Sequence, residues 1–379
     1  MKIVYILPTL NAKGGTERIV TEKANYLVSH FGYEVYIISM YQQVNEPSCY
    51  PLSDKIHQIN LGIPYYSQYK YKYPKRLFFK IRIHKQLKEE LNNTIQLLDP
   101  DILISISYAM ADIVSKIPSK AFKITECHEP RELVMSKIYN NSLFARIYAR
   151  YYYFRTIEKN SDIVITLTNE SKKSWQRAKR VEVIPNFSSM KITQQINCRN
   201  RTIISVGRLG KEKGYDRLID IWESISAKYS DWQLDIYGDG QLREELNNII
   251  KSKHIPSITL QGQTNDISPK YANSSICVVT SYFEGFSLVI LEAMKHGVPC
   301  VAFDCPYGPR SIIEDGKNGY LVEDGNISLF VEKLCSLIEN TKLRLQFSEA
   351  AKERAKYFDT DKIMLQWKSL FEDLYNGRI

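Results

Sequence analysis

Residues 276–302 read ICVVTSYFEGFSLVILEAMKHGVPCVA. The apolar run over 276–280 lacks polar alternation, which predicts a strand covered on both faces. A glycine-containing turn follows, then a helix expected over 286–297, then a second apolar strand over 298–302. Strand–helix–strand order is the repeating unit of parallel α/β sheets, so this stretch predicts that class of fold.

The same alternation extends in both directions from this unit. In the second half we expect further strands over 202–206, 233–237, 257–261 and 319–322, with helices over 214–229, 241–253 and 326–339. In the first half we expect strands over 2–7, 34–39, 101–106, 121–125, 162–167 and 181–184, with helices over 16–30 and 76–98. This pattern predicts two Rossmann-like, doubly wound parallel-sheet domains, whose strand ends are the usual place for a ligand.

A polar stretch after Pro185 separates the two halves and is expected to be the linker. We therefore expect a first domain over 1–190 and a second over 191–355. A C-terminal helix within 356–379 carries large apolar residues, and its return to the first domain is left open.

Charge divides unevenly between the halves of this 379-residue chain, whose formal net charge is +9. Residues 1–195 hold 28 Lys and Arg against 17 Asp and Glu, and the remainder holds 23 against 25. A basic half fits nucleic acid, a membrane or an anionic substrate. No nucleic-acid-binding module accompanies it, so we expect no nucleic-acid partner.

The seven cysteines are odd in number and form no C-x-x-C motif. This usage predicts neither a disulfide framework nor a zinc site, and it fits the reducing cytoplasm. No run of 18 uncharged apolar residues exists, so we expect no transmembrane helix.

The helix expected to start near Phe286 predicts an anion site, because free amides and the helix dipole converge at a helix start. Glu284 lies in the preceding turn and Glu292 eight residues later. At about 100° per residue, eight residues bring both side chains to nearly one helix face. Two carboxylates beside an anion site suggest hydrogen-bond acceptors for the hydroxyls of a sugar and of a ribose.

Three further loops follow predicted strands. Arg208 and Lys213 flank a turn and are expected to converge on one phosphate pair. Gly14 and Gly15 permit close approach of the backbone to a ligand. His128 follows the strand over 121–125, where catalytic side chains often lie, although a surface histidine is an equal alternative.

The glycine spacings do not form the G-x-G-x-x-G of dinucleotide-binding proteins. No histidine or cysteine cluster predicts a metal site. Two Asp-x-Asp matches, at 99–101 and 359–361, are expected to be a turn and a helix cap.

These pieces together resemble the family 4 retaining glycosyltransferases, which have the GT-B fold of two Rossmann-like domains facing each other across a cleft. The resemblance covers residues 203–325 closely. It rests on Gly207-Arg208-Leu209, Lys213-Gly214, Ile236 to Gly240, Glu284-x7-Glu292 with Ala293-Met294, Gly297-Val298-Pro299, Gly308-Pro309 and Asn318-Gly319. The first half is similar through Gly14-Gly15-x-Glu17, His128 and Ile184-Pro185-Asn186.

The resemblance implies a metal-independent reaction with a nucleotide diphosphate sugar, expected to be a UDP-sugar, as co-substrate and no other cofactor. It implies that Arg208, Lys213 and Gly15 meet the diphosphate and that His128 lies beside the reacting sugar. It further implies that Glu284 binds sugar hydroxyls near the backbone of Gly285 and Phe286, that the amides of Ser287 and Leu288 meet phosphates, and that Glu292 takes the ribose. Many relatives have Gly where this chain has Ser287.

Two other functions stay open: an inactive nucleotide-sugar-binding protein and a GT-B-like sugar-nucleotide epimerase. For the transferase we expect a hexose or N-acetylhexosamine donor and a glycan acceptor, lipid-linked and used in cell-surface polysaccharide synthesis.

The segment 65–88 holds eight Lys and Arg, five Tyr, two Phe and no acidic residue. That composition predicts attachment to an anionic membrane, with the enzyme peripheral on the inner face of the cell membrane. In the alternative, Leu77, Ile81, Leu87 and Leu91 pack a helix onto the sheet and the basic loop is merely solvated.

Overall fold

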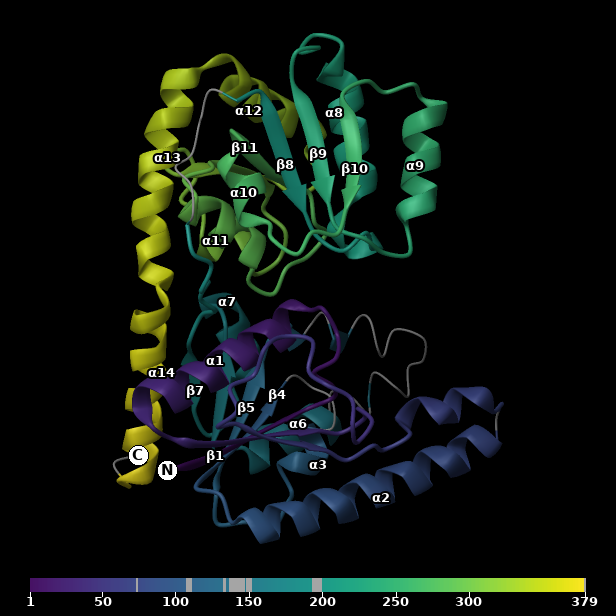
Figure 1. The fold of residues 1–379 in the computed structure, drawn as a ribbon, viewed down its shortest axis with the longest axis vertical. Coiled ribbons are helices and arrows are strands. Elements are labelled where there is room, and N and C mark those ends of the chain that lie inside the picture. Colours follow the sequence, from purple (N-terminus) through teal and green to yellow (C-terminus); the bar gives the residue numbers. More distant parts are fainter. Residues whose placement is uncertain are drawn as a thin grey trace. The chain divides into compact units, whose positions relative to one another are not determined.

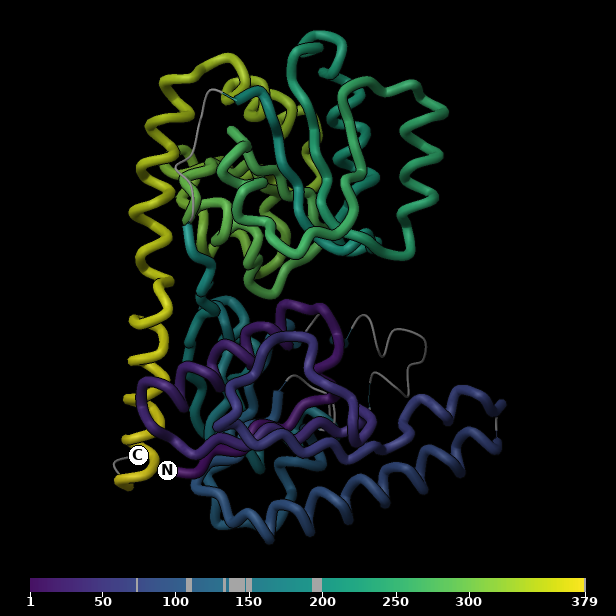
Figure 2. The backbone as a smooth tube through the Cα atoms, viewed as in Figure 1, coloured from purple at the N-terminus to yellow at the C-terminus, as the bar shows by residue number. Residues whose placement is uncertain are grey.

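The computed structural model describes residues 1–72, 74–106, 111–131, 134–135, 147, 152–192 and 200–377. Its chain forms two compact units, Met1–Pro185 with Ile363–Ile379 and Asn186–Lys362. The first division falls at Pro185, where residue 190 was expected, and the second at Lys362, where residue 355 was expected. The C-terminal residues from Ile363 belong to the first unit. Figure 2 traces the backbone from purple at the N-terminus to yellow at the C-terminus.

The first unit contains a seven-stranded parallel sheet in the order β3-β2-β1-β4-β5-β6-β7. Its strands are β1 (Lys2–Leu7), β2 (Glu34–Ser39), β3 (His57–Asn60), β4 (Ile102–Ile106), β5 (Phe122–Cys127), β6 (Ile163–Thr166) and β7 (Val181–Val183). Its helices include α1 (Gly15–Phe31), α2 (Lys75–Leu98), α3 (Ala111–Val114), α6 (Phe154–Asn160), α7 (Asn169–Lys172) and α14 (Thr360–Tyr375), the last of which begins in the second unit. A short 3-10 helix, η1 (Tyr65–Lys70), precedes α2.

One strand of this sheet, β3, was not predicted. Its residues His-Gln-Ile-Asn are too polar to stand out as a buried strand. It nevertheless pairs in parallel with β2 at the edge of the sheet, where one side of a strand faces no neighbour. Tertiary pairing, rather than local sequence, forms this strand.

The second unit contains a six-stranded parallel sheet in the order β10-β9-β8-β11-β12-β13 (Figure 1). Its strands are β8 (Thr202–Val206), β9 (Gln233–Tyr237), β10 (Ile258–Gly262), β11 (Ile276–Val279), β12 (Cys300–Phe303) and β13 (Gly319–Val322). Its helices are α8 (Tyr215–Ser226), α9 (Arg243–Ser252), α10 (Ser268–Ala272), α11 (Leu288–Lys295), α12 (Ile327–Glu339) and α13 (Thr341–Ala355). The prediction of two doubly wound parallel sheets is confirmed.

The core of the second unit lies between its sheet and the helices α8 and α12. Trp222 and Phe330 are fully buried there, and the ring of Phe303 lies 4.6 Å from that of Phe330. Burying each such side chain contributes roughly 1.5–3 kcal/mol to folding. This core stabilises the central strands of the sheet, from whose ends the loops of the candidate site extend.

Helix α2 is only partly packed on the first sheet. Its buried residues recur every fourth position from Ile83 to Ile95, so its second half covers the sheet. Leu77 and Ile81, which the alternative interpretation placed on the sheet, are 47% and 61% exposed. The first two turns of α2 therefore carry apolar side chains that this unit does not bury.

Helix α11 begins at Leu288, two residues later than predicted. The delay has a backbone cause, because Ser287 adopts the left-handed conformation, with φ 65° and ψ 72°. Ser287 is 5% exposed, and its hydroxyl has no hydrogen-bond partner among the residues that the structure describes. A side chain in this conformation costs about 1–2 kcal/mol relative to glycine.

We predict that Ser287→Gly raises the thermal midpoint of the protein by about 2–4 °C, equivalent to about 1 kcal/mol. Glycine removes the left-handed strain and the unpaired hydroxyl, and its greater freedom in the unfolded chain takes back part of the gain. Ser287→Ala is the matched control, because it removes only the hydroxyl and keeps the strain. Calorimetry of both variants checks this, and a lower midpoint for Ser287→Gly than for the wild type would contradict it.

Candidate functional site

Two loops meet at the carboxyl ends of β8 and β11. These strands are neighbours in the sheet, and the strand order reverses between them. Such a reversal leaves a crevice, because the connections on either side run to opposite faces of the sheet. The loop after β8 carries Arg208 and Lys213, and the loop after β11 carries Glu284.

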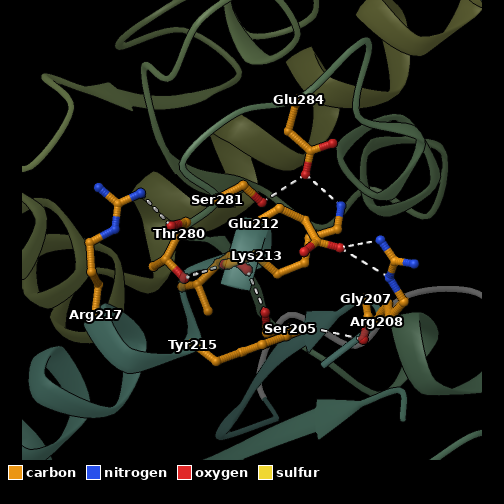
Figure 3. Close-up of polar contacts among 11 residues, drawn as sticks. Ser205, Gly207, Arg208, Glu212, Lys213, Tyr215, Arg217, Thr280, Ser281 and Glu284 are labelled. Carbon is orange, nitrogen blue, oxygen red and sulfur yellow. Dashed lines mark hydrogen bonds and ion pairs between the residues drawn. The ribbon is translucent and has the colours of Figure 1, made fainter. Parts of the chain in front are cut away.

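A lysine and a glutamate join the two loops (Figure 3). Lys213 Nζ lies 2.7 Å from Glu284 Oε1, and the Ser281 hydroxyl donates to the same oxygen at 2.7 Å. Glu284 is 9% exposed, so little water competes for these bonds. Charge-assisted hydrogen bonds in such a sheltered place are about twice as strong as neutral ones. The predicted site residues Lys213 and Glu284 are therefore brought into direct contact.

Arg208 takes a different partner. Its Nε donates to Glu212 Oε1 at 3.0 Å, and its side chain is 73% exposed. Burial would raise the pKa of Glu212, but its backbone amide and Arg208 more than offset this and lower it. Each cation is paired with its own carboxylate, and the convergence of Arg208 and Lys213 on one phosphate pair stays a prediction.

Side chains that the sequence did not single out hold the two loops together. Arg217 of α8 donates to the carbonyl oxygen of Thr280 at 2.6 Å and to Asp324 at 2.7 Å, and its guanidinium lies 3.9 Å from the ring centroid of Tyr282. The Thr280 hydroxyl donates to the carbonyl oxygen of Gly214 at 2.9 Å. Nothing distinguishes Arg217 from an ordinary solvated helix residue until the loops are placed beside it.

The loop after β8 lies so close to the end of β9 that Gly238, the residue after β9, has no room for a side chain. A Cβ on Gly238, whose φ is 140°, would lie 1.9 Å from the carbonyl oxygen of Gly207. The two backbones touch directly, and this contact fixes where Arg208 leaves the sheet.

Glu292 lies in α11 and is 4% exposed, with the Tyr271 hydroxyl donating to its Oε2 at 3.3 Å. The argument that it shares a helix face with Glu284 was wrong. Glu284 lies before the helix, in an isolated bridge to Tyr307, and the left-handed Ser287 interrupts the helical phase between the two carboxylates.

The start of α11 presents backbone amides. The amide of Ile290 bonds back to the carbonyl oxygen of Ser287 at 3.1 Å, so the amides of Ser287 and Leu288 precede the first helical bond. The Phe286 ring packs against that of Phe358 at 5.5 Å, so its side chain is engaged within the second unit. This end of α11 has the polarity that binds anions.

The remaining predicted residues belong to the first unit. Gly15 opens α1, and the carboxylate of Glu17 folds back over the backbone of Gly14. His128 directly follows β5 and is 7% exposed. Its Nε2 lies 3.0 Å from Glu126 Oε1, a contact that the sequence did not predict.

Within the described residues, no three His, Cys, Asp or Glu side chains are grouped so that they could hold a metal ion. In the first Asp-x-Asp match, Asp99 is the left-handed C-cap of α2, and Asp101 accepts from the backbone amide of Lys2 at 2.6 Å. In the second, Asp361 lies in the first turn of α14. No helix of the described chain is long and apolar enough to cross a bilayer.

Comparison with known proteins places the chain among sugar transferases. The family described as Glycosyltransferase Family 4 matches residues 13–188, and the one described as Glycosyl transferases group 1 matches residues 188–354. An uncharacterized glycosyltransferase of Haemophilus influenzae is 31% identical over 377 residues, which span 97% of this chain and 99% of that protein.

The amylovoran biosynthesis glycosyltransferase AmsD of Erwinia amylovora is 27% identical over 381 residues, with the same coverage of both chains. Among solved structures, TarM of S. aureus in complex with UDP superposes with a TM-score of 0.76 at 18% identity, covering 98% of this chain and 99% of that one. That likeness concerns the fold alone. The matched families and the full-length relatives show that this chain is a family 4 glycosyltransferase with the GT-B fold.

Proposed function

We propose that the chain is a retaining glycosyltransferase that moves a hexose or N-acetylhexosamine from a UDP-sugar to a growing surface polysaccharide on a lipid carrier. The observation that carries the proposal is the Lys213–Glu284 contact beside the start of α11. A cation, a carboxylate and the backbone amides at the start of α11 lie together where the strand order reverses between β8 and β11. A sugar diphosphate needs the cation and the amides for its phosphates and the carboxylate for its hydroxyls. The name of AmsD supports polysaccharide synthesis, and the UDP bound to TarM supports the nucleotide.

The donor's charged half meets Arg208, Lys213 and the amides of Ser287 and Leu288. Its sugar hydroxyls donate to Glu284. Oε1 of that carboxylate already receives Lys213 and Ser281, so Oε2 offers its lone pairs to the sugar. The backbone of Gly285 and Phe286 lines the same turn. Glu292 accepts hydrogen bonds from the ribose hydroxyls, which replace the long hydrogen bond that Tyr271 donates to its carboxylate.

The chemistry follows from where charge develops. Breaking the bond between the anomeric carbon and the phosphate oxygen makes the sugar positive and the diphosphate more negative. Arg208, Lys213 and the helix start stabilise the departing diphosphate without a metal ion. Gly15 lets the backbone of the first unit approach that group, and His128 contacts the reacting sugar. A diphosphate oxygen takes the acceptor's proton on the same face, so the configuration is retained without an enzymic nucleophile.

Two other activities would use the same donor site. An inactive nucleotide-sugar-binding protein would bind the donor and release no UDP, and an epimerase would convert the donor with no acceptor present. The paired Lys213 and Glu284 favour transfer, because a protein that only binds its ligand does not need to stabilise a leaving group. Incubating the donor with and without acceptor separates the three activities.

We predict that Glu284→Gln lowers kcat/KM for sugar transfer by about 10²-fold or more while the protein stays folded. The amide keeps the shape but loses the charge that draws hydroxyl protons and orients Lys213. Glu339→Gln is the matched control, because Glu339 Oε1 lies 2.8 Å from Lys228 Nζ in an exposed pair of the same unit. UDP release measures both variants, and near-wild-type turnover by Glu284→Gln would contradict the assignment.

We predict that Arg208→Ala and Lys213→Ala each lower kcat/KM by about 10²-fold, and that the double variant loses less than the product of the two. The losses overlap because both cations act on one diphosphate. Lys211→Ala is the control, since Lys211 is an exposed basic residue of the same loop. Losses that multiply cleanly would show that the two cations serve separate groups.

The acceptor's location is proposed from the surface formed by η1 and the first turns of α2, called here the Tyr–Lys face. Its exposed apolar side chains are Tyr66, Tyr69, Leu77, Phe78 and Ile81, between 47% and 68% exposed. Its basic residues are Lys70, Lys72, Lys75, Arg76, Lys80 and Arg82. Tyr73, within the same segment, lies outside the described residues.

Local contacts order this face. The Tyr71 ring stacks on Phe79 at 4.1 Å, and the Arg76 guanidinium lies 4.5 Å from the Tyr69 ring centroid. Aromatic and basic side chains held together in this way match a membrane surface, where rings enter the headgroup layer and cations meet anionic lipid. We propose that the first unit docks there, on the inner face of the cell membrane, next to a lipid-linked acceptor.

We predict that the protein sediments with vesicles containing anionic lipid, that binding weakens as salt rises, and that neutral vesicles retain little. Replacing Lys70, Lys72, Lys75 and Arg76 by Ser should abolish binding, since each basic residue contributes about 1 kcal/mol. The charge-matched control replaces Lys172, Lys173, Arg177 and Lys179, exposed residues of the same unit. Equal losses in both quadruple variants would mean that net charge, and not the Tyr–Lys face, governs binding.

A further inference from the structure

The first unit buries three titratable side chains in mutual contact. Lys23 of α1 and Glu126 of β5 are each 1% exposed, and His128 is 7% exposed. Lys23 Nζ donates to both carboxylate oxygens of Glu126. Nε2 of His128 lies 3.0 Å from Oε1 of the same carboxylate. One glutamate therefore stands between a lysine and a histidine, and the proposed mechanism gives a role only to the histidine.

Aromatic rings cover this group. Lys23 Nζ lies 4.3 Å from the ring centroid of Trp367, on α14, and 5.5 Å from that of Tyr5, on β1. Burial lowers the pKa of Lys23, although Glu126 opposes that shift. Burial would raise the pKa of Glu126, but Lys23 and then His128 more than offset this and lower it to about 2. The carboxylate thus stays ionised in a place where an unpaired charge would cost several kcal/mol.

The contact with Glu126 selects one form of the His128 ring. A nitrogen lone pair 3.0 Å from a carboxylate oxygen would be repelled, so the proton belongs on Nε2 even though the N–H bond is not aimed straight at the oxygen. In a neutral ring, Nδ1 then carries the lone pair. A carboxylate behind a histidine commonly fixes the tautomer in this way.

Lys23 acts on the His128 contact through the carboxylate. Its ammonium binds both oxygens of Glu126, so it fixes where Oε1 lies relative to the His128 ring.

We propose that Glu126 and Lys23 are positioning residues for His128: Glu126 holds its Nε2–H tautomer, and Lys23 holds the Glu126 carboxylate in place, so that Nδ1 accepts a hydrogen bond from a hydroxyl of the transferred sugar. The contact with the sugar rests on the proposed function; the tautomer does not. A purely structural ion pair would affect stability and leave the ring's tautomer alone.

The direct test is nitrogen NMR of the histidine-labelled full-length protein without substrate, with the His128 signal assigned by its loss in His128→Gln. We expect the neutral ring to carry its proton on Nε2. In the double variant Lys23→Met with Glu126→Leu, which removes the facing carboxylate, the Nδ1–H form should gain population. An Nδ1–H tautomer in the wild type, or a tautomer unchanged in the double variant, would overturn the proposal.

Kinetics gives the second readout. The double variant Lys23→Met with Glu126→Gln leaves no buried charge unpaired and keeps an oxygen facing Nε2, so its kcat should stay near that of the wild type. Lys23→Met with Glu126→Leu removes that oxygen, and its kcat should fall.

Thermal midpoints of all variants separate loss of folding from loss of positioning. If both double variants behave alike, the facing oxygen does not matter and the tautomer proposal is wrong. If His128→Ala keeps wild-type turnover, the role of His128 in the proposed function fails. That failure is distinguishable, because the NMR result is read without donor or acceptor.

Discussion

The proposed donor site depends on the contact between Lys213 and Glu284. It ties the loop after β8 to the loop after β11, and those strands are neighbours because the strand order reverses between them. Two further hydrogen bonds connect these loops, one from Arg217 to the Thr280 carbonyl oxygen and one from the Thr280 hydroxyl to the Gly214 carbonyl oxygen. A cation and a carboxylate thereby lie together beside the backbone amides at the start of α11. Groups held in place before the reaction spend little energy on rearrangement during it.

Each unit has a lysine–glutamate ion pair at the end of one of its strands. In each, a lysine from a neighbouring segment neutralises a buried glutamate, Lys213 with Glu284 and Lys23 with Glu126. The difference lies in access. The Lys213 side chain is 22% exposed and can turn to a diphosphate, whereas the Lys23 side chain is 2% exposed and is covered by the ring of Trp367. The first pair is suited to exchange partners with a ligand, and the second is suited to hold a neighbouring histidine unchanged.

Much of this organisation could be predicted from sequence, because parallel strands buried on both faces appear as apolar runs. The polar strand β3 could not be predicted from its sequence, because only its pairing with β2 makes it a strand. Arg208, Lys213 and Glu284 were found because they follow strands. Their partners Glu212, Ser281 and Arg217 were not, because ordinary surface residues have the same pattern. Lys23 lies in a helix that looks amphipathic, and nothing local marks it as buried. The helical-phase argument for Glu284 and Glu292 failed at Ser287, where a single left-handed residue moves the helix start.

We propose that protein groups alone bind the donor diphosphate. Calorimetric titration with UDP, UMP and uridine in excess EDTA tests it most directly, with Arg208→Ala as the comparison. We predict that affinity falls by about tenfold or more with each phosphate removed, which is about 1.4 kcal/mol per step. In Arg208→Ala, the UDP and UMP affinities should move closer together. Uridine binding as tightly as UDP, or UDP binding that appears only when Mg²⁺ or Mn²⁺ is restored, would contradict the account.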